Sequence, residues 1–442
     1  MGQFSTKLQE NLYNRGFLSS SKASAFDLLM LISLVLFPLL YMTLRSWTNS
    51  FVFALFILAN IYFISHPSAF KMSLSEKASK WIFFTLSSPF LAIVISQIFR
   101  QDFSATAFDG PSRILLTAFI FLYLKDRQVN FTKILEWVLP VSLIICLGAY
   151  LLNPAASAMW GNRAATYFVD TITFGTYCLI LGFICLISIR ISSTQERPIL
   201  TILKIIGFII GCYLAIKSQS RSAWTAGIGL LIYWSFIRPQ KRNLLTSWAL
   251  IGLSTMGILL IYKFSPEVNQ RIQTGIHEVI TYFRSNNFDT SLGLRISMIR
   301  VAINLIMENP FSGLKDGVMP ALNTITSIKP FYTDLLQHMI TNTGTHAEIL
   351  AQGVRSGIWG LISSSALFAV PGVIFFSRIS SKNPQIRSAS ILGLTLVLGL
   401  FIASLTIQVF NLKYTSSFYA LMIAGLAAQA LPNRTIKINE QE

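Results

Sequence analysis

The stretch FGTYCLILGFICLISI, residues 174–189, carries no charged side chain. Its length is close to that of a membrane-spanning helix. Comparable apolar runs lie at residues 26–44, 50–65, 81–98, 113–124, 134–152, 200–216, 223–237, 244–262, 356–376, 389–407 and 416–431. The sequence therefore predicts an all-α polytopic membrane protein with about 12 transmembrane helices.

The composition of the chain points to the same class of protein. Of its 442 residues, 53% are hydrophobic and 12% are charged, and the mean hydropathy is +0.59. These values exclude an ordinary soluble globular protein. The net charge of +17 arises from basic residues that flank the apolar runs, so it predicts membrane topology and not a nucleic-acid partner. The four cysteines lie inside apolar runs and are expected to pack as small hydrophobic residues.

Lysine and arginine residues are concentrated in alternate loops. One such loop holds Lys71, Lys77 and Lys80. By the positive-inside rule, these loops and both termini are cytoplasmic, and the polar segment that follows the ninth run is periplasmic. The predicted parts are transmembrane helices 1–9 in residues 1–262, one large periplasmic helical loop or lid in residues 263–345, and transmembrane helices 10–12 in residues 346–442.

Two amphipathic helices are expected in the periplasmic loop, at residues 266–284 and 294–308. Asn309 and Pro310 end the second one. The apolar faces are formed by Val268, Ile272, Ile276, Val279 and Ile280 in the first helix and by Ile296, Ile299, Ala302, Ile303 and Ile306 in the second.

Two arginines stand out as candidates for binding an anion. Arg221 lies in a very short turn on the outer side, where positive charge is usually depleted. It is either a snorkelling topology residue or a ligand for a negative group near the hydrocarbon edge. Arg295 follows Gly293 at the start of a predicted helix, whose free backbone N–H groups favour anions. The alternative is that Arg295 is a solvated arginine on the surface of the loop helix. Arg300 fits this alternative better than Arg295 does.

His346 is the candidate base, because an imidazole can accept a proton from a hydroxyl group near neutral pH. A purely structural histidine is the alternative, and His338 is a nearby competitor. Thr345 and Glu348 have the spacing of a capping box at the start of the next helix. That structural role weakens Glu348 as a catalytic candidate.

Arg113 and Arg163 also lie on the outer side and can add positive potential to a shared cavity or pair with nearby aspartates. The outer side has no closely spaced His and carboxylate cluster for a divalent metal, and no phosphate-cradling glycine loop. If a diphosphate binds here, arginines are expected to neutralise it in place of a metal.

Four motifs together resemble the O-antigen ligase family. They are QSR at residues 219–221, SLGLR at 291–295, ENPF at 308–311 and HAEIL…GIWG at 346–360. The domain that gives this resemblance is shared with O-antigen polymerases and protein O-oligosaccharyltransferases. The sequence has Ala347 where the family's His-Asn-Glu-like motif has asparagine, so any role of that asparagine does not carry over.

The resemblance implies a membrane glycosyltransferase with a GT-C-like helical fold in the bacterial inner membrane and an active site on the periplasmic face. Such a protein would transfer O-antigen from undecaprenyl diphosphate to an outer-core sugar of lipid A–core. The implied reaction is inverting and independent of metal or other cofactor. His346 would then be catalytic, and Arg221 and Arg295 would bind the diphosphate. Arg113 and Arg163 match less securely as further substrate-binding residues.

Three alternatives remain open on the sequence. An O-antigen polymerase or a protein O-oligosaccharyltransferase would use the same lipid-linked donor with a different acceptor. A polysaccharide or lipid transporter would bind such a substrate without forming a bond. The scarcity of charges within the spans and the concentration of polar residues in one outer loop argue against the transporter.

Overall fold

The structure is a computed structural model that describes residues 25–191, 197–237, 252, 255–256, 262–285, 287–315, 319–410 and 412–432. Within these residues the regular elements are α-helices and short 3₁₀-helices, as predicted. The first group of helices comprises α2 (Ala25–Leu36), α3 (Trp47–Ser65), α4 (Pro67–Ser73), α5 (Lys77–Arg100), η1 (Ala105–Phe108), α6 (Asp109–Arg127), α7 (Phe131–Leu152), α8 (Pro154–Ala158), α9 (Thr171–Ile191), α10 (Pro198–Lys217) and α11 (Arg221–Phe236). The second group comprises α13 (Pro266–Ser285), α14 (Ser291–Glu308), η2 (Leu322–Thr324), η3 (Lys329–Phe331), α15 (Asp334–Thr343), α16 (Glu348–Phe376), α17 (Pro384–Ser404) and α18 (Lys413–Ala430).

Eight helical segments of the described chain are long and apolar enough to cross a membrane. They are Trp47–Ser65, Lys77–Arg100, Ala105–Arg127, Phe131–Leu152, Thr171–Ile189, Pro198–Lys217, Glu348–Phe376 and Pro384–Ser404. The protein is therefore a polytopic membrane protein. The predicted total of 12 spans stays a prediction, because the run at 244–262 lies largely outside the described residues. The first run is interrupted after Leu36 by a series of turns.

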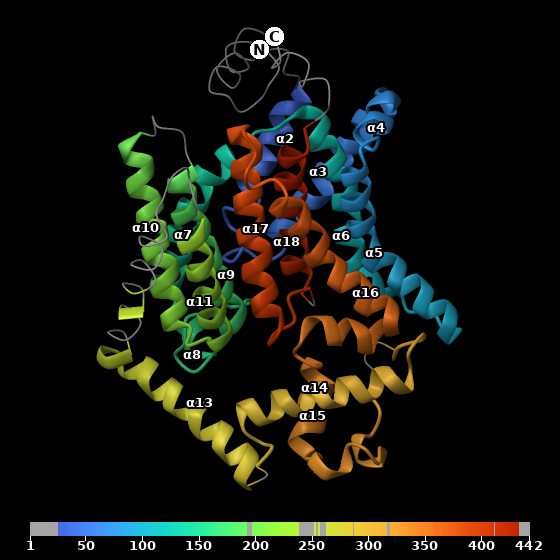
Figure 1. The fold of residues 1–442 in the computed structure, drawn as a ribbon, viewed down its shortest axis with the longest axis vertical. Helices are drawn as coiled ribbons and strands as arrows, with labels where there is room; N and C mark the ends of the chain where they lie inside the picture. Colours follow the sequence, from blue (N-terminus) through green and yellow to red (C-terminus); the bar gives the residue numbers. More distant parts are fainter. Residues whose placement is uncertain are drawn as a thin grey trace.

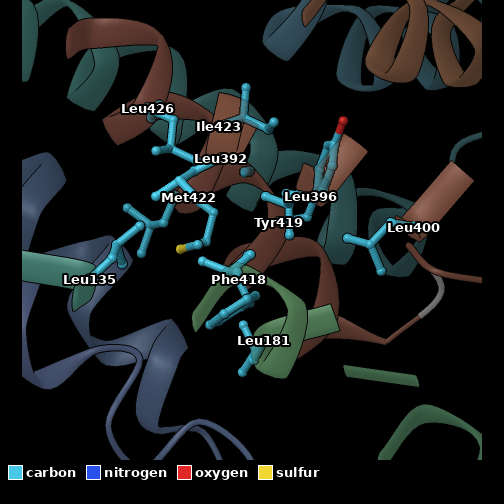
Figure 2. Packing of buried hydrophobic residues seen from close by; sticks show 14 of the residues in the cluster. Leu135, Leu181, Leu392, Leu396, Leu400, Phe418, Tyr419, Met422, Ile423 and Leu426 are labelled. Atoms are coloured by element: carbon cyan, nitrogen blue, oxygen red, sulfur yellow. The ribbon is translucent and has the colours of Figure 1, made fainter. Parts of the chain in front are cut away.

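Helix α18 lies at the centre of the bundle. Almost every side chain from Thr415 to the end of the helix is buried, which is typical of a helix that is covered on all sides. Figure 2 shows Phe418 and Met422 among leucines from α7, α9 and α17. This packed centre holds the membrane helices in fixed positions, so residues at their ends can form a defined site.

The two ends of the bundle differ in their ionic contacts. At one end, buried Lys125 donates to Glu76 over 3.0 Å, and Arg127 forms a 2.6 Å ion pair with Asp27. Arg378 reaches the same Glu76 over 3.4 Å. These basic residues come from the loops that the positive-inside rule assigns to the cytoplasm. The opposite end is covered by α13, α14 and α15 (Figure 1).

The segment predicted as a lid contains helices at the expected places, α13 and α14. In α14 the buried side is formed by residues such as Met298, Val301 and Leu305, and these pack with apolar side chains of α15 and the loops before it. Of the predicted apolar face, Ala302 is buried, while Ile303 is 44% exposed. In α13 the apolar residue Ile276 is 51% exposed, while Glu278 is buried. The Glu278 carboxylate forms an ion pair with Arg221 of the bundle, so the buried side of α13 includes a polar contact.

Candidate functional site

Arg221 connects the membrane bundle to the lid. It is the first residue of α11, where the Ser220 hydroxyl caps the helix by accepting from the Ala223 N–H. The guanidinium reaches α13 and pairs with Glu278 through two hydrogen bonds, Nη1–Oε2 at 2.6 Å and Nη2–Oε1 at 3.3 Å. This two-point geometry is the strongest form of an arginine–carboxylate pair. Arg221 is therefore more than a snorkelling residue.

One face of α13 receives this guanidinium. Arg271, Gly275 and Glu278 recur at helical spacing. The Arg271 carbonyl accepts from Arg221 Nη2 over 3.4 Å, and a Cβ added at Gly275 would lie 3.5 Å from the Arg221 Cζ. The Nε atoms of Arg221 and Arg271 are buried without a hydrogen-bond partner. Unpartnered buried donors of this kind are costly unless a ligand or water satisfies them.

Arg295 of α14 and Arg163 complete a group of four arginines. Burial, then Arg221 and Arg271, lowers the pKa of Arg295, while Glu278 opposes this shift. Burial, then Arg271, lowers the pKa of Arg163, and Arg295 acts in the same direction. Guanidinium groups remain charged through such shifts. The four cations therefore share one electrostatic field, in which Glu278 and Asp170 supply the opposing charges.

Arg163 is placed by the turn before α9. Its Nε donates to the Ser218 carbonyl over 2.8 Å, and the next residue, Ala164, donates its N–H to the Lys217 carbonyl over 3.0 Å. Asp170 accepts from the first backbone N–H groups of α9 and so caps that helix. The loop is thus fixed against the α10–α11 turn that holds Arg221.

His346 lies between α15 and α16 in a left-handed backbone conformation, with φ of 43°. Such a conformation is uncommon for residues other than glycine and is concentrated at functional sites. Its Nε2 lies 3.4 Å from the Thr343 hydroxyl. Burial, followed by the charge of Arg295, lowers the pKa of His346, whereas Asp170 opposes the shift. The imidazole is therefore mainly neutral at pH 7, as a base requires.

The predicted capping box at the start of α16 is wrong. The helix begins at Glu348, and its preceding residue Ala347 makes no side-chain cap. The Thr345 hydroxyl is buried and has no hydrogen-bond partner. Glu348 is fully buried and accepts from the Phe410 N–H and the Gln352 amide, both over 2.8 Å. Glu348 therefore has a structural role other than the predicted one. Its carboxylate accepts a hydrogen bond from the backbone of the loop before α18.

Arg113 and His338 lie apart from this group. Arg113 forms an ion pair with Asp109 of its own helix over 3.7 Å and lies 6.0 Å from the Phe53 ring centroid. His338 is exposed on α15. Neither affects the pKa of the arginines or of His346 among the described residues. Of the residues predicted from the sequence, the structure thus brings together Arg163, Arg221, Arg295 and His346.

Arg271 is a member of the group that we did not single out from the sequence. The sequence does contain a pattern that indicates this residue. Arg271, Gly275 and Glu278 lie on one helical face, which therefore carries two opposite charges with a residue without a side chain between them. The apolar periodicity of the same helix pointed to the other face. Only the fold shows that the polar face meets Arg221.

The ENPF and GIWG motifs form a structural joint between α14 and α16. Helix α16 is interrupted at Ser356 and Gly357, which have non-helical backbone angles. The Ile358 N–H donates to the Pro310 carbonyl over 2.7 Å, and the Leu314 N–H donates to the Val354 carbonyl over 2.7 Å. Arg100 donates to the carbonyls of Ser312 and Arg355 across the same joint. The lid is thereby attached to a membrane helix.

Gly357→Ala is expected to destabilise this joint. Gly357 has φ of +61°, and an added Cβ would lie 2.2 Å from the Pro310 carbonyl oxygen, so the variant should lose about 1–3 kcal/mol or more of stability. Thermal unfolding in detergent measures the loss. The matched control is Gly148→Ala in α7, which has no atom within 4 Å of the new Cβ. Equal melting temperatures of the two variants would contradict this account.

No group of three or more His, Cys, Asp or Glu side chains suited to a metal ion occurs in the described part of the chain. The prediction that the reaction needs no metal remains a prediction.

Residues 206–365 match the family model described as O-antigen ligase. The matched region contains Arg221, Arg271, Arg295 and His346, and the match confirms the resemblance drawn from the motifs. The chain is also similar to a Haemophilus influenzae protein named as uncharacterized. The two are 25% identical over 374 residues, which cover 81% of this chain and 88% of the relative.

Proposed function

We propose that this chain, which carries the O-antigen ligase match over residues 206–365, transfers O-antigen polysaccharide from undecaprenyl diphosphate to an outer-core sugar of lipid A–core. The observation that carries this proposal is the group of four arginines next to a neutral histidine, at the lid-covered end of the membrane helices. The end opposite the basic loops is periplasmic in this proposal, and both termini are cytoplasmic.

The arginines suit the donor because a diphosphate diester carries two negative charges and accepts many hydrogen bonds. The side chains of Arg271 and Arg295 make no hydrogen bond or ion pair with another residue in the described ranges. Their donors are therefore available to a ligand. Glu278 offsets the charge of Arg221 in the absence of donor, and a diphosphate would compete with this carboxylate for the guanidinium.

In the proposed step, the neutral His346 imidazole accepts the proton of an acceptor hydroxyl. The hydroxyl oxygen forms a bond to the anomeric carbon of the donor glycan from the side opposite the diphosphate. The bond from that carbon to the diphosphate oxygen breaks, and the electron pair leaves with undecaprenyl diphosphate. The anomeric configuration is inverted. Arg221 and Arg295 stabilise the charge that grows on the leaving oxygen.

An O-antigen polymerase or a protein O-oligosaccharyltransferase would use the same donor groups. These alternatives differ in the acceptor, and the family match is common to them. A transporter is less well supported, because it has no use for a neutral base held beside a cationic group.

The test is transfer by the purified protein in lipid nanodiscs. With lipid-linked O-antigen and lipid A–core, we expect glycan on lipid A–core and an equal amount of released undecaprenyl diphosphate, also in the presence of a chelator. Longer glycan on the lipid carrier would instead identify a polymerase. Binding of donor with no new glycosidic bond under any acceptor condition would overturn the proposal.

A further inference from the structure

A cavity of about 300 Å³ is lined in part by Thr343, Gly344 and Thr345, the three residues that precede His346. It is bounded by the end of α15, the start of α16, the chain on either side of 316–318, and Gln408 from the loop before α18. Its volume is at the lower end of the range for small-ligand sites. The cavity does not include the four arginines, so it is separate from the proposed diphosphate site.

The polar groups of this cavity are mainly amides and hydroxyls. They are the side chains of Thr341, Asn342, Thr343, Thr345, Gln352 and Gln408. Two cations also line it, and both are engaged elsewhere: Lys315 pairs with Asp102 over 3.5 Å, and Arg355 donates to the Ala107 carbonyl over 2.9 Å. Aspartate and glutamate are absent from the described lining residues. Such a lining matches the hydroxyl groups of a sugar better than a diphosphate.

The Thr345 hydroxyl is an independent indication of a ligand. Thr345 is 2% exposed and lines the cavity, and its hydroxyl has no partner. A buried hydroxyl without a hydrogen bond costs stability that a ligand or a bound water can restore. Apolar side chains such as Ile340 and Val354 lie in the same wall and can contact the carbon face of a sugar ring.

The position of the cavity relates it to the base. Thr343 and Thr345 line the cavity, and the Thr343 hydroxyl lies 3.4 Å from His346 Nε2. Gln408 holds this turn by donating to the Thr343 carbonyl over 3.1 Å. The imidazole is also within the field of Arg295. His346 therefore contacts a residue of the amide-lined cavity and also interacts electrostatically with the cationic group.

We propose that this cavity binds the terminal saccharide of the acceptor, a neutral sugar whose hydroxyl is presented to His346. The inference rests on the proposed function, because it assigns the second substrate of that reaction. The cavity orients the acceptor sugar, and the arginines, which lie outside the cavity lining, hold the donor.

Cysteine labelling tests this assignment without turnover. The four native cysteines lie within membrane helices, so a polar maleimide should react mainly with an exposed cysteine introduced by Asn342→Cys. Lipid A–core is expected to slow this labelling at least fivefold, and undecaprenyl diphosphate is expected to leave it unchanged. Thr324→Cys, which is exposed and does not line the cavity, is the matched control and should react equally in all conditions.

Thr345→Val gives a second measurement. Removal of an unpartnered buried hydroxyl should leave the melting temperature unchanged or higher, while the acceptor KM rises about fivefold to tenfold and the donor KM stays the same. Equal labelling of Asn342→Cys with and without saturating lipid A–core, or protection by the donor alone, would overturn the cavity assignment. If the wild-type protein also makes product in that case, the proposed transferase function stands and only the acceptor site is wrong.

Discussion

His346→Ala is expected to lower turnover in the transfer assay by about 10²–10⁴-fold, the usual contribution of a general base. The imidazole is a neutral basic side chain within the field of the arginine group, and its Nε2 lies 3.4 Å from the hydroxyl of Thr343, which lines the amide-rich cavity. Alanine would leave the acceptor hydroxyl without a proton acceptor. The four arginines would still be present, so donor binding should change little, and the loss should appear in kcat.

His338→Ala is the matched control for this variant. His338 is exposed on α15 and outside the arginine group, so the control should retain nearly full activity.

In the wild-type protein, kcat/KM should fall as the pH decreases through the pKa of His346. Burial and Arg295 lower this pKa from its ordinary value of 6.5. The pH at which kcat/KM has fallen to half of its maximum should therefore lie below 6.5. A fully active His346→Ala variant would remove the base from the mechanism.

The membrane helices could be predicted from the sequence because apolar length is a local property of the chain. The positions of α5, α9 and α17 follow directly from uninterrupted apolar runs. The face that each lid helix buries could not be predicted in this way. In α13, the buried side includes the ion pair between Glu278 and Arg221, and these residues are 57 positions apart in the sequence.

The candidate site could be predicted only in part, because some of its contacts join elements that are distant in the sequence. Arg221, Arg295 and His346 were chosen from unusual local positions and from family resemblance, and the fold brings them into one group. Arg271 was missed, because its meaning depends on a partner from another element. The box assigned to Thr345 and Glu348 satisfied the sequence pattern, yet Glu348 instead accepts from the backbone of Phe410. A hydrogen bond to a residue distant in the sequence thus takes the place of the local capping interaction.

Arg295→Gln is expected to lower kcat/KM for the lipid-linked donor by about 10²–10³-fold, as the loss of a preorganised donor at a developing negative charge typically does. Arg221 is partly neutralised by Glu278, and Arg163 is hydrogen-bonded to the Ser218 carbonyl. Arg295, by contrast, has no hydrogen-bond or ion-pair partner among the residues that the structure describes. More of its interaction energy is therefore available to the diphosphate, and glutamine would keep polarity while removing the charge.

Arg300→Gln provides the control on the same helix, because Arg300 lies over the rings of Tyr282 and Phe331 and not within the arginine group. We expect this control to retain most of its activity. The Arg295→Gln variant should also shift the acid limb of the pH profile to higher pH. Removal of a positive charge that lowers the pKa of His346 lets that pKa rise toward 6.5. A structural defect would lower activity at every pH without moving the midpoint. Donor kinetics and the pH midpoint together therefore separate a residue that binds the diphosphate beside the base from one that only supports the fold.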